Sequence, residues 1–455
     1  MPVERRKPFS AASALRRAAA YAASFPKPIW LLVAATLVES TGRFMVVPYL
    51  SLYMKGEGVS LGALGFVLGA APIASVAFGA WGGHLADRWG RKPVQILGVS
   101  LSASALFGFA FAGSNVYVLA LLNFLNGMTR TFYRPATNAA IADFAPPERR
   151  SEAYALHRIA INAAFGWGPL IGVGLFLVAP RTGFIVSGVL NLLVGVFIAL
   201  AIPESSSPSE SASPLKSASP LKSASPAESA SPSESAQVGE RLDRLGAATR
   251  PAWRAIAADG VFWLWTFGMM LVWGAYDLIQ SFLPLHLTEA GVPLWVYGSA
   301  LTVNALVCVF AQLPASRLLR VAPIGPSAGA SKLAFAVGFL GLAFLRSPAW
   351  LLAAMLVLSI GEVWGSAVQS RFVPEHASPE LLGRYLGLST LFELGKAFVA
   401  PAAGFLMQAA GGSAVFAMAA VLSVAGGSLL YLAGSRHDGS GLVPARSARS
   451  TRARA

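Results

Sequence analysis

The chain has 455 residues, of which 55% are hydrophobic and 12% are charged, and that charged share is about half the share of a soluble domain. Its net charge of +14 would suit a nucleic-acid-binding protein. However, the lysines and arginines gather in segments that would lie on one side of a membrane, so we exclude nucleic acid as a partner. The single cysteine, Cys308, excludes an intrachain disulfide.

The chain begins with a basic, alanine-rich segment over residues 1–28. The apolar run after it is too long for the hydrophobic region of a signal peptide, so no cleavable signal is predicted. A bilayer core needs about 20 apolar residues per helix, and segments of about that length predict spans at 29–54, 60–82, 93–113, 115–142, 153–178, 183–202, 261–287, 294–314, 325–345, 349–372, 384–408 and 413–433. An even number of spans places both termini on one side, and the lysine and arginine bias makes that side the cytoplasm. The sequence therefore predicts an all-α, multi-pass protein of the cell membrane with twelve transmembrane helices.

Two segments outside the spans are rich in small and polar residues. Residues 204–256 separate spans six and seven and contain a repeated SASPLK sequence, a composition that cannot bury enough apolar surface to fold. We expect a flexible cytoplasmic spacer between a six-helix bundle at 29–203 and a second one at 257–435. A basic tail at 436–455 is expected to be disordered and to touch anionic lipid headgroups.

The two halves of the chain resemble each other in sequence. Tyr49–Tyr53, followed by Gly58, aligns with Phe282–His286, followed by Gly291. Two halves in tandem, each with an even number of spans, form parallel repeats about an axis along the membrane normal. Transporters built in this way bind cargo near the middle of the membrane, between the halves.

A charged motif follows the second span, with the residues Gly83, His84, Leu85, Ala86, Asp87, Arg88, Trp89, Gly90, Arg91 and Lys92. The chain is expected to turn tightly here, with Gly83 and Gly90 supplying the conformational freedom. The cations suit the cytoplasmic face. Asp87 can accept hydrogen bonds from neighbouring arginines or from amides at a helix start. Such a cluster can hold two halves together in one conformation and release them in another.

The motif resembles the signature sequence of the major facilitator superfamily and matches it at every fixed position. The resemblance implies two pseudo-symmetric six-helix bundles and a gating role for Asp87, Arg88 and Arg91 in stabilising an outward-facing state. The alternative is an anchor that only fixes topology. The counterpart in the second half is degraded, with Arg320 in the place of Asp87, so a symmetric pair of gates is not expected.

A second resemblance lies in span five, where Gly166, Gly168, Pro169 and Gly172 are similar to the antiporter motif of the superfamily. Glycine and proline here would bend the helix and allow close packing. In the superfamily this motif marks exporters, so the resemblance implies export rather than uptake. The arginine expected early in span four is replaced by Asn123, and Arg130 and Arg134 further along the span are the candidates to substitute for it.

Charged residues inside the predicted spans are few. Each charge near the middle of a bilayer costs about 2.5–3.5 kcal/mol on insertion scales, so each needs a partner or a wet cavity. The ten are Glu39, Arg43, Arg130, Arg134, Arg158, Asp277, Lys332, Glu362, Glu393 and Lys396. The resemblance implies that spans one, four, seven and ten line the cavity, and six of the ten lie on those spans.

Three of these carboxylates are candidate proton carriers. A buried carboxylate beside an arginine has a pKa set by opposing effects of desolvation and charge, and alternating exposure would change that balance. Glu39 is the first choice, followed by Asp277 and Glu362. The alternative is a static ion pair of Glu39 with Arg43 or Arg130. Glu393 with Lys396 is interpreted as structural.

The substrate cavity is expected to combine apolar walls with a few polar groups, as small-molecule sites do. Its candidates are Arg43, Arg130, Arg134, Phe44, Tyr133, Trp273, Tyr276 and Trp364. Any one of the aromatic residues could equally belong to an interface belt or to core packing.

The sequence therefore predicts a proton-coupled exporter of small amphiphilic compounds that acts as a monomer, with the proton gradient as its energy source and no cofactor or metal. A lipid or glycolipid flippase, a proton symporter for nutrient uptake and a transporter-like sensor remain as alternatives. An enzyme is not expected, because there is no nucleophile motif, metal-ligand cluster or phosphate-binding loop.

Overall fold

The computed structural model describes residues 24–205, 253–345 and 347–439, and in these residues the regular structure is entirely helical. The predicted segments 1–28, 204–256 and 436–455 therefore lie mostly outside the described residues. Where they can be compared, residues 253–257 form a short helix before the seventh span. The last helix continues to Gly439, four residues into the predicted tail.

The N-terminal half of the chain consists of α2 to α8. Its helices are α2 (Lys27–Val46), α3 (Leu50–Gly56), α4 (Leu61–Trp89), α5 (Arg91–Phe111), α6 (Val116–Phe144), α7 (Arg150–Val178) and α8 (Pro180–Ala201), with short 3-10 turns at Val47–Tyr49 and Pro147–Arg149. Side chains cap two of the helix starts, since Ser60 accepts a hydrogen bond from the Ala63 amide and Asn115 accepts from the amides of Tyr117 and Val118. Such caps satisfy amides that have no partner within the helix.

The C-terminal half consists of α10 to α16. Its helices are α10 (Gly260–Ser281), α11 (Leu283–Glu289), α12 (Leu294–Leu318), α13 (Ile324–Ala343), α14 (Pro348–His376), α15 (Leu382–Ser389) and α16 (Leu394–Gly439), with 3-10 turns at Leu319–Val321 and Thr390–Glu393. Gly411 has a φ of 75° and divides α16 into two helices. This positive φ suits glycine because it has no Cβ.

Ten helical segments of the described residues are long and apolar enough to cross a membrane. The last of them, Leu382–Gly439, contains the two helices that meet at Gly411. The 29-residue helix α6 is absent from the ten because its second half carries polar and charged residues. With α6 included and α16 divided, the described residues hold twelve long helical segments, in agreement with the predicted spans.

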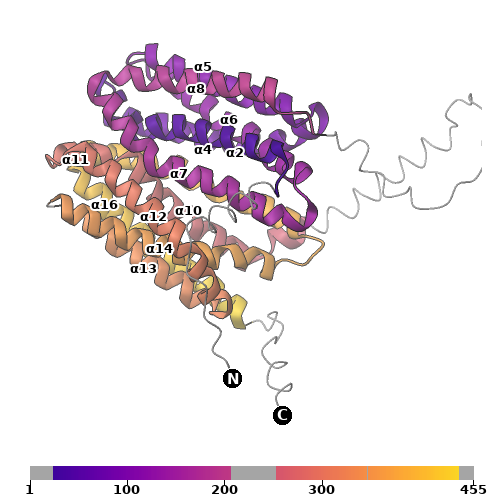
Figure 1. Cartoon of the computed structure of the whole chain (residues 1–455). Helices are drawn as coiled ribbons and strands as arrows, with labels where there is room; N and C mark the ends of the chain where they lie inside the picture. The colour runs from indigo at the N-terminus through magenta and orange to yellow at the C-terminus, as the bar shows by residue number, and fades with distance from the viewer. Residues whose placement is uncertain (1–23, 206–252, 346, 440–455) are drawn as a thin grey trace, which may run out of the picture.

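Each half forms its own bundle, and the two bundles lie side by side (Figure 1). In the first bundle α2 packs on α7 and α8, while α6 packs on α4 and α5; in the second α16 packs on α10 and α13, and α14 packs on α12 and α13. The largest contacts between the bundles are those of α4 with α16 and of α7 with α12. Glycines bring the joining helices together, since a Cβ on Gly65 would collide with the Ala400 carbonyl and one on Gly404 with the Leu61 carbonyl. Small residues allow this approach in lipid-facing bundles.

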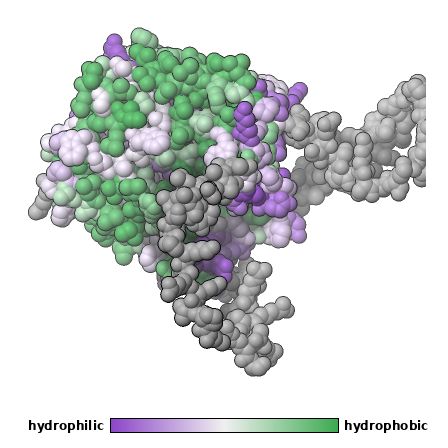
Figure 2. All heavy atoms as spheres, in the orientation of Figure 1, coloured by the Kyte–Doolittle hydropathy of each residue, from purple (hydrophilic) through white to green (hydrophobic). Residues whose placement is uncertain are grey.

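The contacts between the halves lie toward one end of the molecule. We call the end where α8 stops at Ala201 and α10 starts at Gly260 the linker end, and the opposite end, which carries α11, the α11 end (Figure 1). Gly65 lies one turn from the start of α4, and Gly298 lies one turn from the start of α12 against Leu170. Both helices start at the α11 end, so the halves are in contact there. Figure 2 shows apolar residues over the sides of the bundles and hydrophilic residues gathered at the linker end.

Candidate functional site

A cavity of about 800 Å³ lies between the two halves. Helix α7 contributes Arg158 and Asn162 from the first half, and α10, α12, α13, α14 and α15 contribute the rest of the lining. The lining segments are those nearer the linker end, because α7, α10 and α13 start there and α12 and α14 end there. Drug-sized ligands occupy cavities of about 300–1,000 Å³, so the volume fits a small organic molecule.

Glu362 on α14 is the acidic group of this cavity among its described lining residues. Its Oε2 atom accepts a hydrogen bond of 2.7 Å from the Tyr276 hydroxyl and one of 2.8 Å from Nδ2 of Asn304. Asn304 is held in turn by the Ser359 hydroxyl at 3.0 Å. These contacts join α10, α12 and α14 and fix the carboxylate in the wall of the cavity.

Aromatic rings form the apolar part of the wall. Trp273 stacks on Phe392 with ring centroids 5.5 Å apart, and Tyr276 stacks on Phe335, also at 5.5 Å. Lys332 on α13 is only 5% exposed, and its Nζ lies 4.4 Å above the Phe335 ring. The cavity thus offers flat apolar surfaces beside one acid and two cations, Lys332 and Arg158.

A second, much smaller cavity of about 20 Å³ lies within the first bundle. Glu39 and Arg43 of α2 face it, and the Arg43 Nε lies 3.7 Å from the Glu39 Oε1. The Ser40 hydroxyl donates a 2.9 Å hydrogen bond to the other carboxylate oxygen of Glu39. Arg130, Tyr133 and Arg134 of α6 complete the charged and aromatic part of this lining.

Asp277 belongs to a third group of charges, around Lys396. The Lys396 Nζ lies 2.7 Å from Oε2 of Glu393 and 3.7 Å from Oδ1 of Asp277. Arg130 of the first half is close enough to interact electrostatically with both carboxylates. Lys396 thus holds two acids of the second half where they face an arginine of the first half.

The predicted substrate residues do not surround one common space. Trp273, Tyr276 and Glu362 line the large cavity, whereas Glu39, Arg43, Arg130, Arg134 and Tyr133 line the small one. Trp364 and Phe44 line neither of these two cavities. Trp364 is 40% exposed because it lies two residues, or about 200° around the helix, from Glu362. Phe44 packs in the bundle, with its ring 4.9 Å from Phe165 and under the Arg43 guanidinium.

Several lining residues were not predicted as part of a site. Arg158 and Lys332 were predicted only as charges within spans, and the lining residues Gln312 and Gln369 were not predicted. Asn304, which holds Glu362 without lining the cavity, was not predicted either. The available signal was a carboxamide side chain within an apolar span, which needs a partner just as a charge does.

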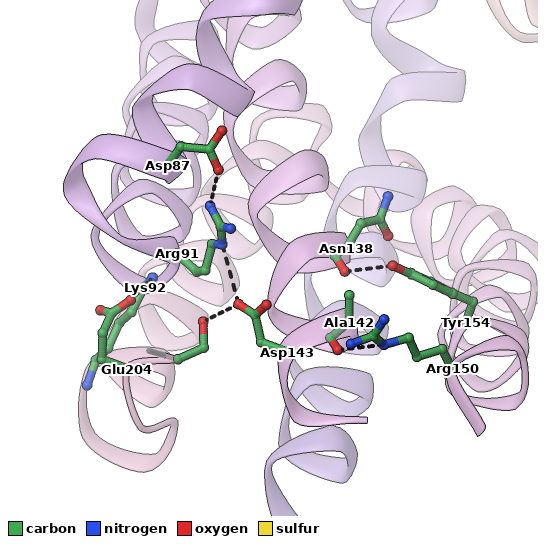
Figure 3. Close-up of polar contacts among 10 residues, drawn as sticks. Asp87, Arg91, Lys92, Asn138, Ala142, Asp143, Arg150, Tyr154 and Glu204 are labelled. Carbon is green, nitrogen blue, oxygen red and sulfur yellow. Dashed lines mark hydrogen bonds and ion pairs between the residues drawn. The ribbon is translucent and has the colours of Figure 1, made fainter. Parts of the chain in front are cut away.

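The signature motif forms a cluster within the first half (Figure 3). Arg91 is 8% exposed and joins two acids, with Nη1 at 2.5 Å from Oδ1 of Asp87 and Nε at 3.4 Å from Oδ2 of Asp143. The Ser205 hydroxyl donates a 2.8 Å hydrogen bond to the same Asp143 oxygen. The Lys92 amide donates to the Glu204 carboxylate at 3.2 Å. The motif therefore ties α4 and α5 to α6 and to the end of α8.

The geometry corrects one detail of the predicted turn at this motif. Gly83 lies inside α4, which continues to Trp89, so it is a helical residue and not a turn residue. Gly90 alone separates α4 from α5, with a φ of 96°. Arg88 is exposed, and the predicted gating role of the motif stays a prediction.

The glycine-rich motif of α7 has two packing faces. A Cβ on Gly172 would collide with the Met45 carbonyl, and one on Gly168 would lie 2.8 Å from the Cβ of Phe44, so this face allows contact with α2. The Pro169 carbonyl accepts a 2.6 Å hydrogen bond from the Tyr49 hydroxyl. On the other face, the Gly166 carbonyl accepts a 2.5 Å hydrogen bond from Thr302 of α12. The motif thus joins α7 both to its own bundle and to the other half.

Comparison with known proteins places the chain in a family. Residues 32–393 match the Major Facilitator Superfamily. An uncharacterized MFS-type transporter of Bacillus subtilis, YqjV, is 24% identical over 374 residues, covering 80% of this chain and 83% of YqjV. The quinolone resistance protein NorA of Staphylococcus aureus is 29% identical over 185 residues, covering 40% of this chain and 47% of NorA.

Solved structures with the same fold have lower sequence identity. A peptide transporter, POT, in complex with sulfate has a TM-score of 0.65 at 16% identity, covering 91% of this chain and 95% of POT. A bacterial homolog of the human lysosomal transporter Spinster, in an inward-facing and unoccupied conformation, has a TM-score of 0.66 at 15% identity. The match covers 90% of this chain and 95% of the homolog. The chain is therefore a multi-pass membrane protein that belongs to the major facilitator superfamily of transporters.

Proposed function

We propose that this transporter exports small amphiphilic compounds in exchange for protons. The observation that carries the proposal is the cavity of about 800 Å³ between the halves, with aromatic walls and the Glu362 carboxylate. Stacked rings suit the apolar part of such a compound, and the acid and the two cations suit its polar part. The similarity of part of the chain to a quinolone resistance protein supports the same substrate class.

Contacts at the α11 end support an inward-facing state for this conformation. The halves touch through Gly65 with Ala400 and through Gly298 with Leu170, and the large cavity extends from mid-helix toward the linker end. The excess of lysine and arginine supports a cytoplasmic position for the linker end in a cell membrane. Export then requires rocking of the halves until the α11 end opens, as in other transporters built from repeats. One chain lines the whole cavity, so the proposed cycle needs no second copy.

Glu362 is the carboxylate that couples cargo to protons in this proposal. It lies in the cavity that would hold the cargo, so a proton and a cargo molecule can compete for one site. Its two hydrogen bonds come from Tyr276 and Asn304 of the same half, so rocking of the halves would keep them and would change instead the exposure of Glu362 to water and to the first half, and with it the stability of the ionised form. Asp277, held near Lys396, and Glu39, beside Arg43, are proposed as further proton carriers of the same exchange cycle.

A lipid flippase finds less support in this geometry. That function would need a cationic headgroup site, for which Arg43, Arg130 and Arg134 were the candidates. These arginines line a cavity of about 20 Å³. That volume suits a water molecule and is far below the volume of a lipid headgroup. Nutrient uptake is distinguished from export by the direction of exchange.

The test uses everted membrane vesicles from a strain that lacks its own exporters. Addition of rhodamine 6G or a quinolone to energised vesicles should release protons, seen as recovery of a quenched pH dye. Glu362→Gln should lower this exchange at least about tenfold, because the amide keeps the shape but cannot carry a proton. Glu380→Gln, an exposed carboxylate in the loop before α15, is the matched control.

Undiminished exchange by Glu362→Gln would contradict the coupling assignment. Movement of labelled lipid in response to the gradient, with neither dye nor quinolone moving protons, would favour the flippase instead. Inward cargo movement together with protons would favour uptake.

A further inference from the structure

The small cavity of the first bundle is surrounded by polar atoms that make no hydrogen bond, one of which, the Arg43 Nε, forms an ion pair with Glu39 at 3.7 Å. Among the described residues, the Tyr133 hydroxyl, the Arg43 Nε and the Asn191 Oδ1 are buried and make no hydrogen bond. The Tyr133 and Asn191 side chains are 5% and 1% exposed, and all three residues line the same cavity. A buried polar atom left unsatisfied costs about 1–3 kcal/mol, so three around one space indicate a hydrogen-bonding occupant.

The size of the cavity identifies the occupant. Its volume of about 20 Å³ exceeds the roughly 10–15 Å³ that one water molecule needs, and a buried water makes two to four hydrogen bonds. The space is too small for an amphiphilic compound. We propose that this cavity binds a water molecule that connects Glu39 to His157, and that His157 passes the proton of Glu39 to the linker end.

A line of hydroxyl groups leads from the cavity to His157. The Thr36 Oγ1 lies 3.2 Å from Nδ1 of His157, and both residues line the cavity together with Glu39. The Tyr133 hydroxyl lies near Thr36 without a hydrogen bond of good geometry to it. Thr36 is about one helical turn from Glu39 on α2, nearer the linker end.

The surroundings of His157 favour a relay over a fixed ion pair. Among described residues, the charged and titratable groups around the cavity are Glu39 and Arg43 on α2, Tyr133, Arg130 and Arg134 on α6, with Arg158 beside His157 on α7. Helix α8 contributes the uncharged Asn191. Among the described residues Glu39 is therefore the acid that faces this cavity, and the proposed water would join it to Thr36, whose Oγ1 is the partner of Nδ1.

The transfer balances without any further reactant. The Glu39 carboxyl group gives its proton to the water, and the water gives one of its protons to the Thr36 oxygen. Thr36 passes its own hydroxyl proton to Nδ1 of His157, which releases the proton on Nε2 toward the linker end. The step leaves a Glu39 carboxylate, His157 with its remaining proton on Nδ1, and one proton on the far side of the relay. A flip of the imidazole ring, with the water and the Thr36 hydroxyl turning back, resets the relay for the next proton. Histidine suits the task because one ring nitrogen can accept a proton while the other gives one up.

This inference rests on the proposed proton coupling, and its test separates the two. The full chain is reconstituted in proteoliposomes, and two quantities are measured: proton flux driven by rhodamine 6G, and counterflow of the dye with no proton gradient. His157→Gln and Thr36→Val should lower the proton flux at least about tenfold and leave counterflow within about twofold. Thr36→Ser keeps the hydroxyl and should restore the flux.

Thr137→Val is the matched control, because the Thr137 hydroxyl is buried near Tyr133 but donates to the Tyr133 carbonyl at 2.8 Å. Size-exclusion chromatography and thermal unfolding confirm that each variant is folded. If the wild-type chain moves no protons, the proposed function itself is contradicted. A wild-type chain that does move them, with His157→Gln unimpaired across pH 6 to 8, would overturn only the relay.

Discussion

At the scale of single residues, the same side chain has different roles according to its partners. Glu362 receives two neutral hydrogen bonds in a large cavity, Asp277 shares Lys396 with Glu393, and Glu39 faces a cavity of the size of a water molecule. From the sequence, Glu39 ranked first and Asp277 and Glu362 after it, because residue type and depth alone do not show which groups surround each carboxylate. Their partners come from other helices, so only the packing of the bundles separates the roles.

Asp259 is a carboxylate outside the spans whose partners are equally specific. It caps α10 by accepting a 2.9 Å hydrogen bond from the Phe262 amide, and it also accepts from the Tyr385 hydroxyl at 2.7 Å. The His376 Nε2 lies 2.8 Å from Oδ2 of Asp259, the oxygen that also accepts from Tyr385. Burial alone would raise the pKa of Asp259, but these hydrogen bonds outweigh burial and hold the pKa below its ordinary value of 3.8.

The lowered pKa of Asp259 predicts a pH-dependent stability. The ionised form of Asp259 is stabilised in the folded protein. Its contribution to the free energy of unfolding is therefore complete above the ordinary pKa of 3.8 and is lost as the pH falls through the lower pKa of the folded state. Asp259→Asn keeps an N-cap and removes the charge. It should lower the unfolding temperature in detergent at pH 7, and the difference from wild type should shrink below pH 3.8. Glu380→Gln, an exposed carboxylate, should show neither effect, and a pH-independent difference for Asp259→Asn would contradict the assignment.

At the scale of helices, small residues determine which faces meet. Gly168 and Gly172 allow α7 to approach α2, whereas Gly174 on the same helix has no heavy atom within 4 Å of where a Cβ would lie. The sequence shows three similar glycines within seven residues. Their different surroundings follow from the direction in which each Cα faces, which depends on the neighbouring helix.

Adding one methyl group should distinguish these glycines. Gly172→Ala places a Cβ against the Met45 carbonyl and the Tyr49 ring, and overpacking of this kind costs about 1–3 kcal/mol. Gly174→Ala meets no such neighbour and should be neutral or slightly stabilising, since alanine favours helix over glycine. Thermal unfolding of the two purified variants measures the difference. Equal stability of both would show that α2 and α7 do not pack as described.

At the scale of the whole molecule, the two halves act as separate bodies joined at the α11 end. The contacts between them include glycine-assisted approaches, hydrogen bonds such as Thr302 to Gly166, and aromatic pairs such as Tyr49 with Tyr297. Among the described residues, the polar contacts Arg91 with Asp143 and Lys92 with Glu204 keep the signature motif within its own half. Contacts between the halves that gather at one end are compatible with rocking about the large cavity.

A disulfide across the halves tests this arrangement. An ideal Cβ on Gly166 lies 3.4 Å from the Cβ of Ala305, close to the roughly 3.5–4.5 Å of disulfides. In a chain with Cys308→Ser, the pair Gly166→Cys and Ala305→Cys should cross-link on oxidation, stop dye exchange and recover on reduction. Each single cysteine variant is a control that should keep exchange after oxidation. Continued exchange by the fully cross-linked pair would contradict rocking at this contact.

Much of the architecture follows from the sequence alone. Apolar runs of bilayer length set the number of long helices, because backbone polar groups in lipid must be satisfied within each helix. The repeat between Tyr49–Tyr53 and Phe282–His286 predicted two related halves, and the helix pairs of the two bundles agree with that division. The family also follows from the sequence, since its motif is a local pattern of residues.

Only the tertiary structure decided which charges share a space. Depth along a helix can be estimated from residue number, but the direction of a side chain about the helix axis cannot be assigned in spans that are apolar nearly all round. Trp364 therefore lies outside both cavities, Asn304 joins Glu362, and Glu39 faces a different cavity from Glu362. A site between helices depends on the mutual rotation of its helices, and that rotation is set by packing with partners distant in sequence.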